Sequence, residues 1–289
     1  MGGWFAQRVW PHRSEKEEPM CRMPAVLVLG AFLGGCAGGY TLTVPDQVAP
    51  AGREATTVVR VQRHEFWVLW LPVEEAALRF RLGASPQRGA YTDKLGYAGT
   101  TVAVPDGPGR YAMTVAHLDR QGDEVTAEIP VYVWDPSRPV LAVDLDCLPP
   151  SWSDAADDAA KGLRGMAESA NICYFTRRGV AAHPHAHEAL RNGQYPDGPI
   201  LLWQRERWHI VRGRWRMPKV VVETRLVSEL PEFRKRFPSL QMGICTGGLA
   251  GKAFAEAGVK CLVIGSAGVG PADVSRYKDW AEFAAKGAP

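Results

Sequence analysis

Between residues 57 and 133, apolar and polar side chains alternate along the chain. The alternation is clearest in Leu78-Arg79-Phe80-Arg81-Leu82, where every second residue is apolar. A period of two is typical of β-strands that bury one face. Turn-forming segments such as Asp106-Gly107-Pro108-Gly109 separate the alternating runs. Short strands about ten residues apart favour a β-sandwich. The strands are expected over 57–61, 78–82, 100–104, 111–115 and 129–133.

After residue 137 the pattern changes to apolar runs that alternate with longer segments of helical period. Val140-Leu141-Ala142-Val143 is continuously apolar, as strands buried on both faces are. Residues 154–169 are rich in alanine and begin with three aspartates, which suit a helix N-terminus. Alternating strands and helices predict a parallel sheet with helices on both faces. Strands are expected over 139–144, 171–176, 199–203, 240–244 and 260–264, and helices over 154–169, 180–191, 224–237 and 249–257.

The N-terminal part of the chain has the layout of an export signal. Arg22 precedes a short apolar stretch, and small residues follow it before the composition changes abruptly. The ending Leu33-Gly34-Gly35-Cys36 resembles the bacterial lipobox, which implies a signal peptide over residues 1–36 and a lipid on Cys36. Two or three acyl chains give lasting membrane attachment. We therefore expect a lipoprotein of the cell envelope, on its periplasmic or extracellular face. The alternative is a buried apolar strand that contains a cysteine by chance.

Length and charge limit the remaining possibilities. A chain of 289 residues has room for about two domains. The net charge of +3 is close to neutral, which argues against nucleic acid as the main partner. No apolar run reaches about 20 residues, so the sequence contains no ordinary transmembrane helix.

Two segments of the first domain resemble bacterial immunoglobulin-like modules. They are Ala90–Ala98, with its Thr92-Asp93 and Gly96, and Pro105–Tyr111, with its Pro108-Gly109. The resemblance implies an all-β, immunoglobulin-like sandwich over residues 37–136, serving as a spacer or binding module. No convergent set of catalytic side chains is evident there.

Polar residues in the second domain follow the predicted strands. Asp144 and Asp146 end the first strand, and Thr176 ends the second. The carboxyl ends of parallel strands are where open α/β sheets place their chemistry. On a strand, carboxylates at i and i+2 point to one side. One could then attack phosphorus while the other holds a proton, and both could bind a hard metal ion. A threonine hydroxyl can bind a phosphoryl oxygen.

At these residues the second domain resembles the haloacid dehalogenase (HAD) superfamily, and within it the lipin-like phosphatidate phosphatases. The matching segments are Val143–Asp146, Tyr174–Arg178, Tyr195–Leu202, Phe237-Pro238 and Ala257–Val259. The resemblance implies a doubly wound α/β sheet over residues 137–289. It also implies Asp144 as nucleophile, Asp146 as general acid/base, and Mg²⁺ held by both. Thr176, Arg177 and Arg225 would bind the phosphate.

The sequence departs from the HAD pattern at several positions. Cys147-Leu148 replaces the usual continuation of the first motif, and Thr246 and Ala250 stand where the fourth motif has acids. No lysine falls clearly at the third motif, where Arg225 lies nearby. Mg²⁺ prefers octahedral oxygen coordination, so its site is expected to be incomplete. Loss of outer-shell support alone commonly costs about 10–100-fold in affinity or activity.

Cys147 and Cys245 follow strands that should be neighbours in such a sheet. In an oxidising envelope they could form a disulfide across the former active site. The alternative is two small buried thiols.

Together these patterns predict a membrane-tethered envelope lipoprotein with a phosphatase-derived domain. Its Mg²⁺-dependent phosphomonoesterase activity is expected to be weakened or lost, with a pocket retained for a phosphorylated lipid headgroup or a small phosphoester. The alternatives are an active phosphatase using Asp144 and Asp146, and a noncatalytic scaffold or adhesion protein.

Overall fold

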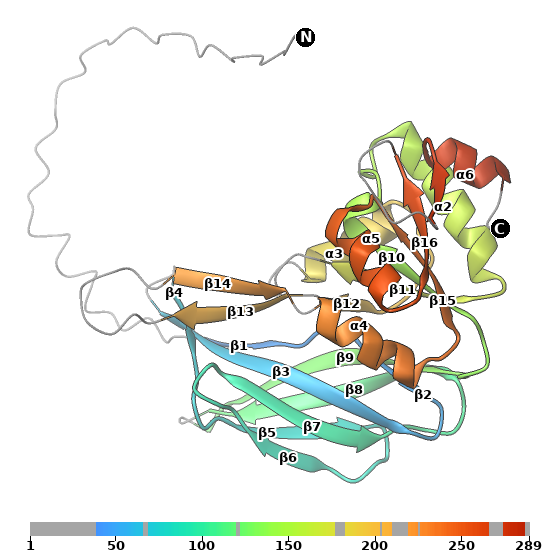
Figure 1. Ribbon diagram of the computed structural model, residues 1–289. Helices are drawn as coiled ribbons and strands as arrows, with labels where there is room; N and C mark the ends of the chain where they lie inside the picture. The colour runs from blue at the N-terminus through green and yellow to red at the C-terminus, as the bar shows by residue number, and fades with distance from the viewer. Residues whose placement is uncertain are drawn as a thin grey trace, which may run out of the picture. The chain divides into compact units, whose positions relative to one another are not determined.

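The computed structural model describes residues 39–65, 69–119, 122–176, 183–202, 204–209, 219–224, 226–265 and 274–286. Its contacts divide the chain into Met1–Ala37 and the compact unit Gly38–Pro289 (Figure 1). Cys36 and the predicted signal peptide lie outside the described residues, so lipidation stays a prediction. In the part that is described, no helix combines the length and apolar character needed to cross a bilayer.

Strands dominate the compact unit. The strands are β1 (Tyr40–Thr43), β2 (Gln47–Pro50), β3 (Glu54–Glu65), β4 (Leu69–Pro72), β5 (Ala77–Leu82), β6 (Arg88–Tyr91), β7 (Tyr97–Ala103), β8 (Gly109–Leu118), β9 (Glu124–Trp134), β10 (Val140–Asp144), β11 (Asn171–Thr176), β12 (Ile200–Leu202), β13 (Gln204–His209), β14 (Lys219–Thr224), β15 (Leu240–Cys245), β16 (Lys260–Ile264) and β17 (Val274–Tyr277). The helices are the 3₁₀ turn η1 (Leu145–Cys147), α2 (Asp154–Ala167), α3 (His183–Asn192), α4 (Leu226–Arg236), α5 (Gly248–Glu256) and α6 (Trp280–Lys286).

The first half of this unit is a pair of packed sheets. One sheet has the order β1-β3-β4, with β7 also paired to β3, and the other has the order β2-β9-β8-β5-β6. In β5, exposed and buried residues alternate strictly, as the sequence predicts. Phe80 from one sheet and Val59 from the other belong to the same buried cluster. The predicted strands are therefore confirmed, and the short strands β1, β2, β4 and β6 are additions that the alternation did not reveal.

The second half is a parallel sheet with helices on both faces. Its order is β12-β11-β10-β15-β16-β17, and every neighbouring pair is parallel. Side chains of α4 and α5 pack on one face of the sheet. Side chains of α2, α3 and α6 pack on the other face. Figure 1 shows these helices around the strands of the sheet. The predicted parallel sheet is confirmed. The structure adds two elements that were not predicted, the edge strand β17 and the helix α6.

The two halves share a buried core. Val48, Tyr132 and Trp134, which come from β2 and β9, belong to the same cluster as the side chains under α4. The rings of Trp134 and Phe237 meet edge to face, with centroids 5.6 Å apart. The predicted domain boundary between residues 136 and 137 falls in an exposed turn of the one compact unit. That boundary stays a prediction.

Candidate functional site

The strand order reverses at β10, and this reversal marks the candidate site. β11 lies on one side of β10 and β15 on the other, so the chain leaves β10 in one direction and later returns on its other edge. Ligands of open α/β sheets bind outside the carboxyl ends of the strands at such a switch point. The described residues at these ends are Asp144 and Asp146, Thr176, and the segment that follows Cys245.

Asp144 is the last residue of β10 and is almost completely buried, with 1% of its surface exposed. Its Oδ1 accepts the backbone N–H of Asp146 at 3.0 Å and so caps the 3₁₀ turn η1. Asp146 is half-buried within that turn. The two acids are therefore held as neighbours. However, the strand geometry on which their predicted common orientation rested ends at Asp144, because Asp146 belongs to a turn.

Thr176 ends β11 and is buried, with 1% of its surface exposed. Asp144 pairs with Phe175 in the parallel register, which puts Thr176 diagonally across from Asp144 on the neighbouring strand. The strand ends thus bring together two of the predicted site positions. Arg177 and Arg225, the other predicted phosphate-binding residues, lie outside the described residues.

The third strand end is a glycine-rich turn at a helix N-terminus. β15 ends at Cys245, and Gly247 and Gly248 follow with φ angles of 96° and 61°. These positive values are accessible to glycine at little cost. Gly247 is the N-cap of α5 and has no side chain to cap the helix. The first turn of a helix presents backbone N–H groups without intrahelical acceptors, which makes it suited to an anion.

The described residues do not complete the predicted Mg²⁺ site. Among them, no group of three His, Cys, Asp or Glu side chains could hold a metal ion. Ala250, where the resemblance to HAD proteins implies an acid, is a residue of α5 whose side chain is buried in the core. Asp279 is exposed, and its Oδ1 caps the start of α6 by accepting the N–H of Glu282. Asp144 and Asp146 are thus the carboxylates available at the strand ends that are described.

The cysteines of the second half are buried free thiols, namely Cys147, Cys173, Cys245 and Cys261. Cys147 lies in η1 after β10 and Cys245 is the last residue of β15, and the two strands are neighbours, as predicted. The sulfur of Cys245, however, lies 3.2 Å from that of Cys261. The thiol of Cys147 lies 3.9 Å from the carbonyl oxygen of Ile244. Burial, and then the negative charge of Asp144, raise the pKa of Cys147 well above its usual value. The predicted Cys147–Cys245 disulfide is absent from this structure.

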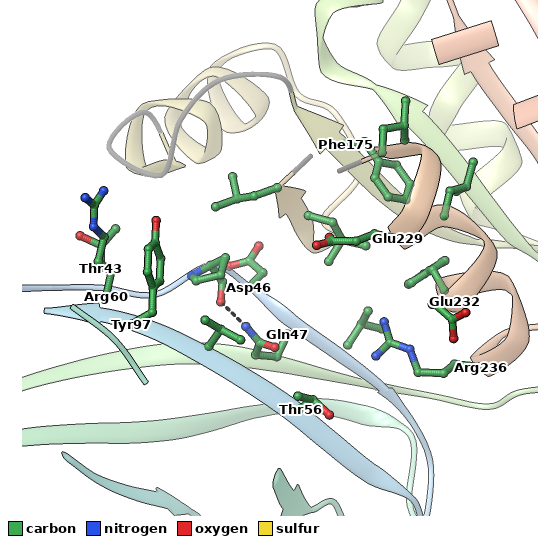
Figure 2. A pocket seen from close by; sticks show the side chains of 18 residues that line it. Thr43, Asp46, Gln47, Thr56, Arg60, Tyr97, Phe175, Glu229, Glu232 and Arg236 are labelled. Atoms are coloured by element: carbon green, nitrogen blue, oxygen red, sulfur yellow. Dashed lines mark hydrogen bonds between the residues drawn. The ribbon is translucent and has the colours of Figure 1, made fainter. Parts of the chain in front are cut away.

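A cavity that the sequence did not predict lies where the two halves meet. It has a volume of about 330 Å³, which is within the range of small-molecule pockets. Figure 2 shows Arg60 and Tyr97 on the side of the β-sheets, facing Glu229, Glu232 and Arg236 of α4 across the cavity. The guanidinium of Arg60 lies over the Tyr97 ring, 5.2 Å from its centroid. Phe175, the residue before Thr176, also lines the cavity.

Two charged residues of the first half are buried: Arg60 is 3% exposed and Asp46 is 2% exposed. The pattern Thr57-Val58-Val59-Arg60-Val61 assigns Arg60 to the outer face of its strand. That face instead lines the cavity, together with residues of α4. One residue in the sequence indicates that this face is partly covered. Val58 is an apolar residue on the same outer face, and it also lines the cavity.

Comparisons with known proteins do not assign the chain to a family. No protein-family model matches it, and no curated protein matches it. The similar solved structures include tandem immunoglobulin repeats of Dlar, with 11% identity, a TM-score of 0.26, and coverage of 37% of this chain and 60% of that chain. XAC1771, a carbohydrate acetylesterase from Xanthomonas citri, has 12% identity, a TM-score of 0.33, and coverage of 78% and 60%. This chain therefore matches about 60% of the length of each. Scores this low carry no argument about function.

Proposed function

We propose that this protein is a lipid-anchored envelope protein whose parallel-sheet half binds a phosphoryl group at the ends of β10, β11 and β15. In this proposal the first half is an immunoglobulin-like spacer and the second half is HAD-like. Its Mg²⁺-dependent phosphomonoesterase activity is weakened or lost. The observation that carries the proposal is that the neighbouring strands β11, β10 and β15 end in Thr176, in Asp144 and just before the Gly247-Gly248 turn, at the β10/β15 switch point.

Two of these three groups suit an anion. The Thr176 hydroxyl can donate a hydrogen bond to a phosphoryl oxygen, and the N-terminal turn of α5 adds backbone donors and a favourable dipole. Asp144 repels an anion unless a cation or a proton compensates its charge. One of its oxygens already accepts the Asp146 N–H, so the carboxylate is fixed in place.

The low expected activity follows from the same residues. A phosphoryl-transfer site relies on positioned groups and on cations that offset the developing charge. The described part of the chain offers two carboxylates there and no third ligand of that kind. With two described carboxylates to hold such a cation, Asp144 can be placed beside a phosphoryl group and still react slowly.

Phosphate binding to the full-length protein tests the proposal. Calorimetric titration with inorganic phosphate should reveal saturable binding, and Thr176→Val should weaken it by about 10-fold or more. A hydrogen bond to a charged group contributes about 1.5–3 kcal/mol, which is the basis of that figure. Thr101→Val, which changes an exposed threonine of β7, is the matched control and should bind as the wild type does.

The same preparations separate binding from catalysis. A generic phosphomonoester with Mg²⁺ should be hydrolysed slowly or not at all, and Asp144→Asn should remove whatever hydrolysis remains. Fast turnover that Asp144→Asn abolishes would favour the active phosphatase. The absence of saturable phosphate binding, or equal binding by Thr176→Val, would reject the phosphoryl site.

The proposed lipid anchor has its own test. In a bacterial host, the wild-type protein should fractionate with membranes, and Cys36→Ser should move it to the soluble fraction because the acyl chains are lost. Cys21→Ser removes another cysteine from the N-terminal segment and should leave the protein with the membranes. Soluble wild-type protein, or membrane attachment that survives Cys36→Ser, would contradict lipidation at this residue.

A further inference from the structure

Two thiols meet beside the β10/β15 switch point. Cys245 ends β15, and Cys261 is the second residue of the neighbouring strand β16. The register pairs Gly243 with Cys261 and Cys245 with Val263, so the two cysteines are diagonal neighbours. Their sulfur atoms lie 3.2 Å apart and are both buried. A disulfide needs a sulfur–sulfur distance of about 2.05 Å and Cα atoms within about 7 Å of each other. Diagonal neighbours are typically about 7–8 Å apart, so closing the bond requires the end of β15 to move toward β16.

The surroundings make the two sulfurs unequal. The backbone N–H of Gly247 donates to the sulfur of Cys245 at 3.4 Å. The hydrogen bond from the Cys261 thiol lowers the pKa of Cys245, although burial opposes this, and the Gly247 N–H lowers it further. The same shared hydrogen bond, together with burial, raises the pKa of Cys261. Cys245 is therefore the more acidic of the two thiols, and thiolates are the nucleophilic form of cysteine.

We propose that Cys245 and Cys261 form an oxidisable dithiol, in which a hydroperoxide oxidises Cys245 and Cys261 then closes a disulfide between β15 and β16. Nothing in this proposal depends on phosphate binding. It assigns the partner of Cys245 to Cys261, in place of Cys147.

The chemistry balances with hydrogen peroxide as the oxidant. The Cys245 thiolate attacks one peroxide oxygen, the O–O bond breaks, and the leaving hydroxide takes up a proton to become water. Cys245 is then a sulfenic acid. The Cys261 sulfur attacks it, the S–S bond forms as the S–O bond breaks, and the oxygen leaves as water with the proton from Cys261. Two thiols have lost two electrons, and one peroxide has become two waters.

The chain becomes exposed within three residues of Cys245. Cys245 is buried, but Thr246 and Gly247 are half-buried and Gly248 is exposed. The reacting sulfur therefore lies just beneath the turn that opens α5. Cys173 offers a contrast: it is buried in β11, and burial raises the pKa of its thiol.

Mass spectrometry of the oxidised full-length protein tests the proposal. Reduced protein is treated with hydrogen peroxide, the remaining thiols are alkylated, and the digest is mapped for linked peptides. A Cys245–Cys261 link should be the main product in wild type and in Cys173→Ser, the matched control. In Cys261→Ser, Cys245 should remain a sulfenic acid that dimedone labels, because its resolving thiol is gone.

Several outcomes would overturn the assignment. They are a dominant Cys147–Cys245 link, oxidation of Cys173 to the same extent as Cys245, and persistence of Cys245 as a free thiol under conditions that oxidise other cysteines. Unfolding of each variant in reductant shows whether it is folded. If Cys261→Ser does not fold, the maps of wild type and Cys173→Ser still decide between the two partners.

Discussion

Replacing Phe254 with alanine should lower the free energy of unfolding by about 3–5 kcal/mol, the usual cost of removing a buried phenyl ring. Phe254 is fully buried in α5, and its ring meets that of Phe175 edge to face with centroids 6.5 Å apart. A Cβ at Gly243 would lie 2.8 Å from this ring. The glycine in β15 and the phenylalanine in α5 therefore fit each other, and alanine at 254 would leave a cavity between sheet and helix.

Leu249→Ala is the control for this prediction. Leu249 lies on the same helix but is 42% exposed. Its truncation should therefore lower the free energy of unfolding by only about 0.5 kcal/mol. Urea unfolding followed by circular dichroism measures both variants. A loss below about 1 kcal/mol for Phe254→Ala, or equal losses for the two variants, would contradict the tight packing of α5 on the sheet.

Replacing Asp46 with alanine should also destabilise the protein strongly, by about 3 kcal/mol. Asp46 Oδ2 accepts the N–H of Ile200 at 2.7 Å and lies 2.8 Å from Nε2 of His187. The side chain of Asp46 is fully buried, and the Ile200 N–H is buried with it. Removing one member of a buried, hydrogen-bonded pair leaves the other polar groups unsatisfied, which typically costs about 3–5 kcal/mol. The lower figure is expected because His187 is 25% exposed and can reach water.

Asp197→Ala provides the comparison, because Asp197 also links the two halves. Its carboxylate lies 3.3 Å from Arg110 and accepts a hydrogen bond from Tyr132, yet 62% of its side chain is exposed. Exposed pairs contribute about 0–1 kcal/mol. Denaturant unfolding should therefore rank Asp46→Ala well below Asp197→Ala in stability. A reversed or equal ranking would mean that the buried carboxylate does not hold the halves together.

Much of the fold could be predicted because its signals are local. Alternation in Leu78–Leu82 identified β5, and the continuous apolar run Val140–Val143 identified β10. Each pattern shows whether one or both faces of a strand are buried. It can be read from side chains that are close together in the sequence. Short strands such as β1 and β6 carry too few residues to display a period, and only pairing with their neighbours defines them.

The candidate site was predictable in its position but not in its geometry. Strand ends could be read from the end of each apolar run, which placed Asp144 and Thr176 on adjacent strands. The 3₁₀ turn that carries Asp146 has no comparable pattern, since it depends on a hydrogen bond to Asp144. The sequence also does not reveal which thiol lies next to Cys245, because this depends on the register between β15 and β16.

The sequence by itself determined most of the longer elements and the strand ends, because each of these is recorded by residues close together in the chain. Only the tertiary structure decided which surfaces are covered. Arg60 stands on the outer face of β3, and Asp46 precedes β2, so local pattern assigns both to solvent. Asp46 is buried against His187 of α3 and Ile200 of β12. Arg60 lines a cavity that α4 also lines. These elements lie more than 100 residues later in the chain. Burial of this kind depends on contacts between distant segments, and no local pattern records them.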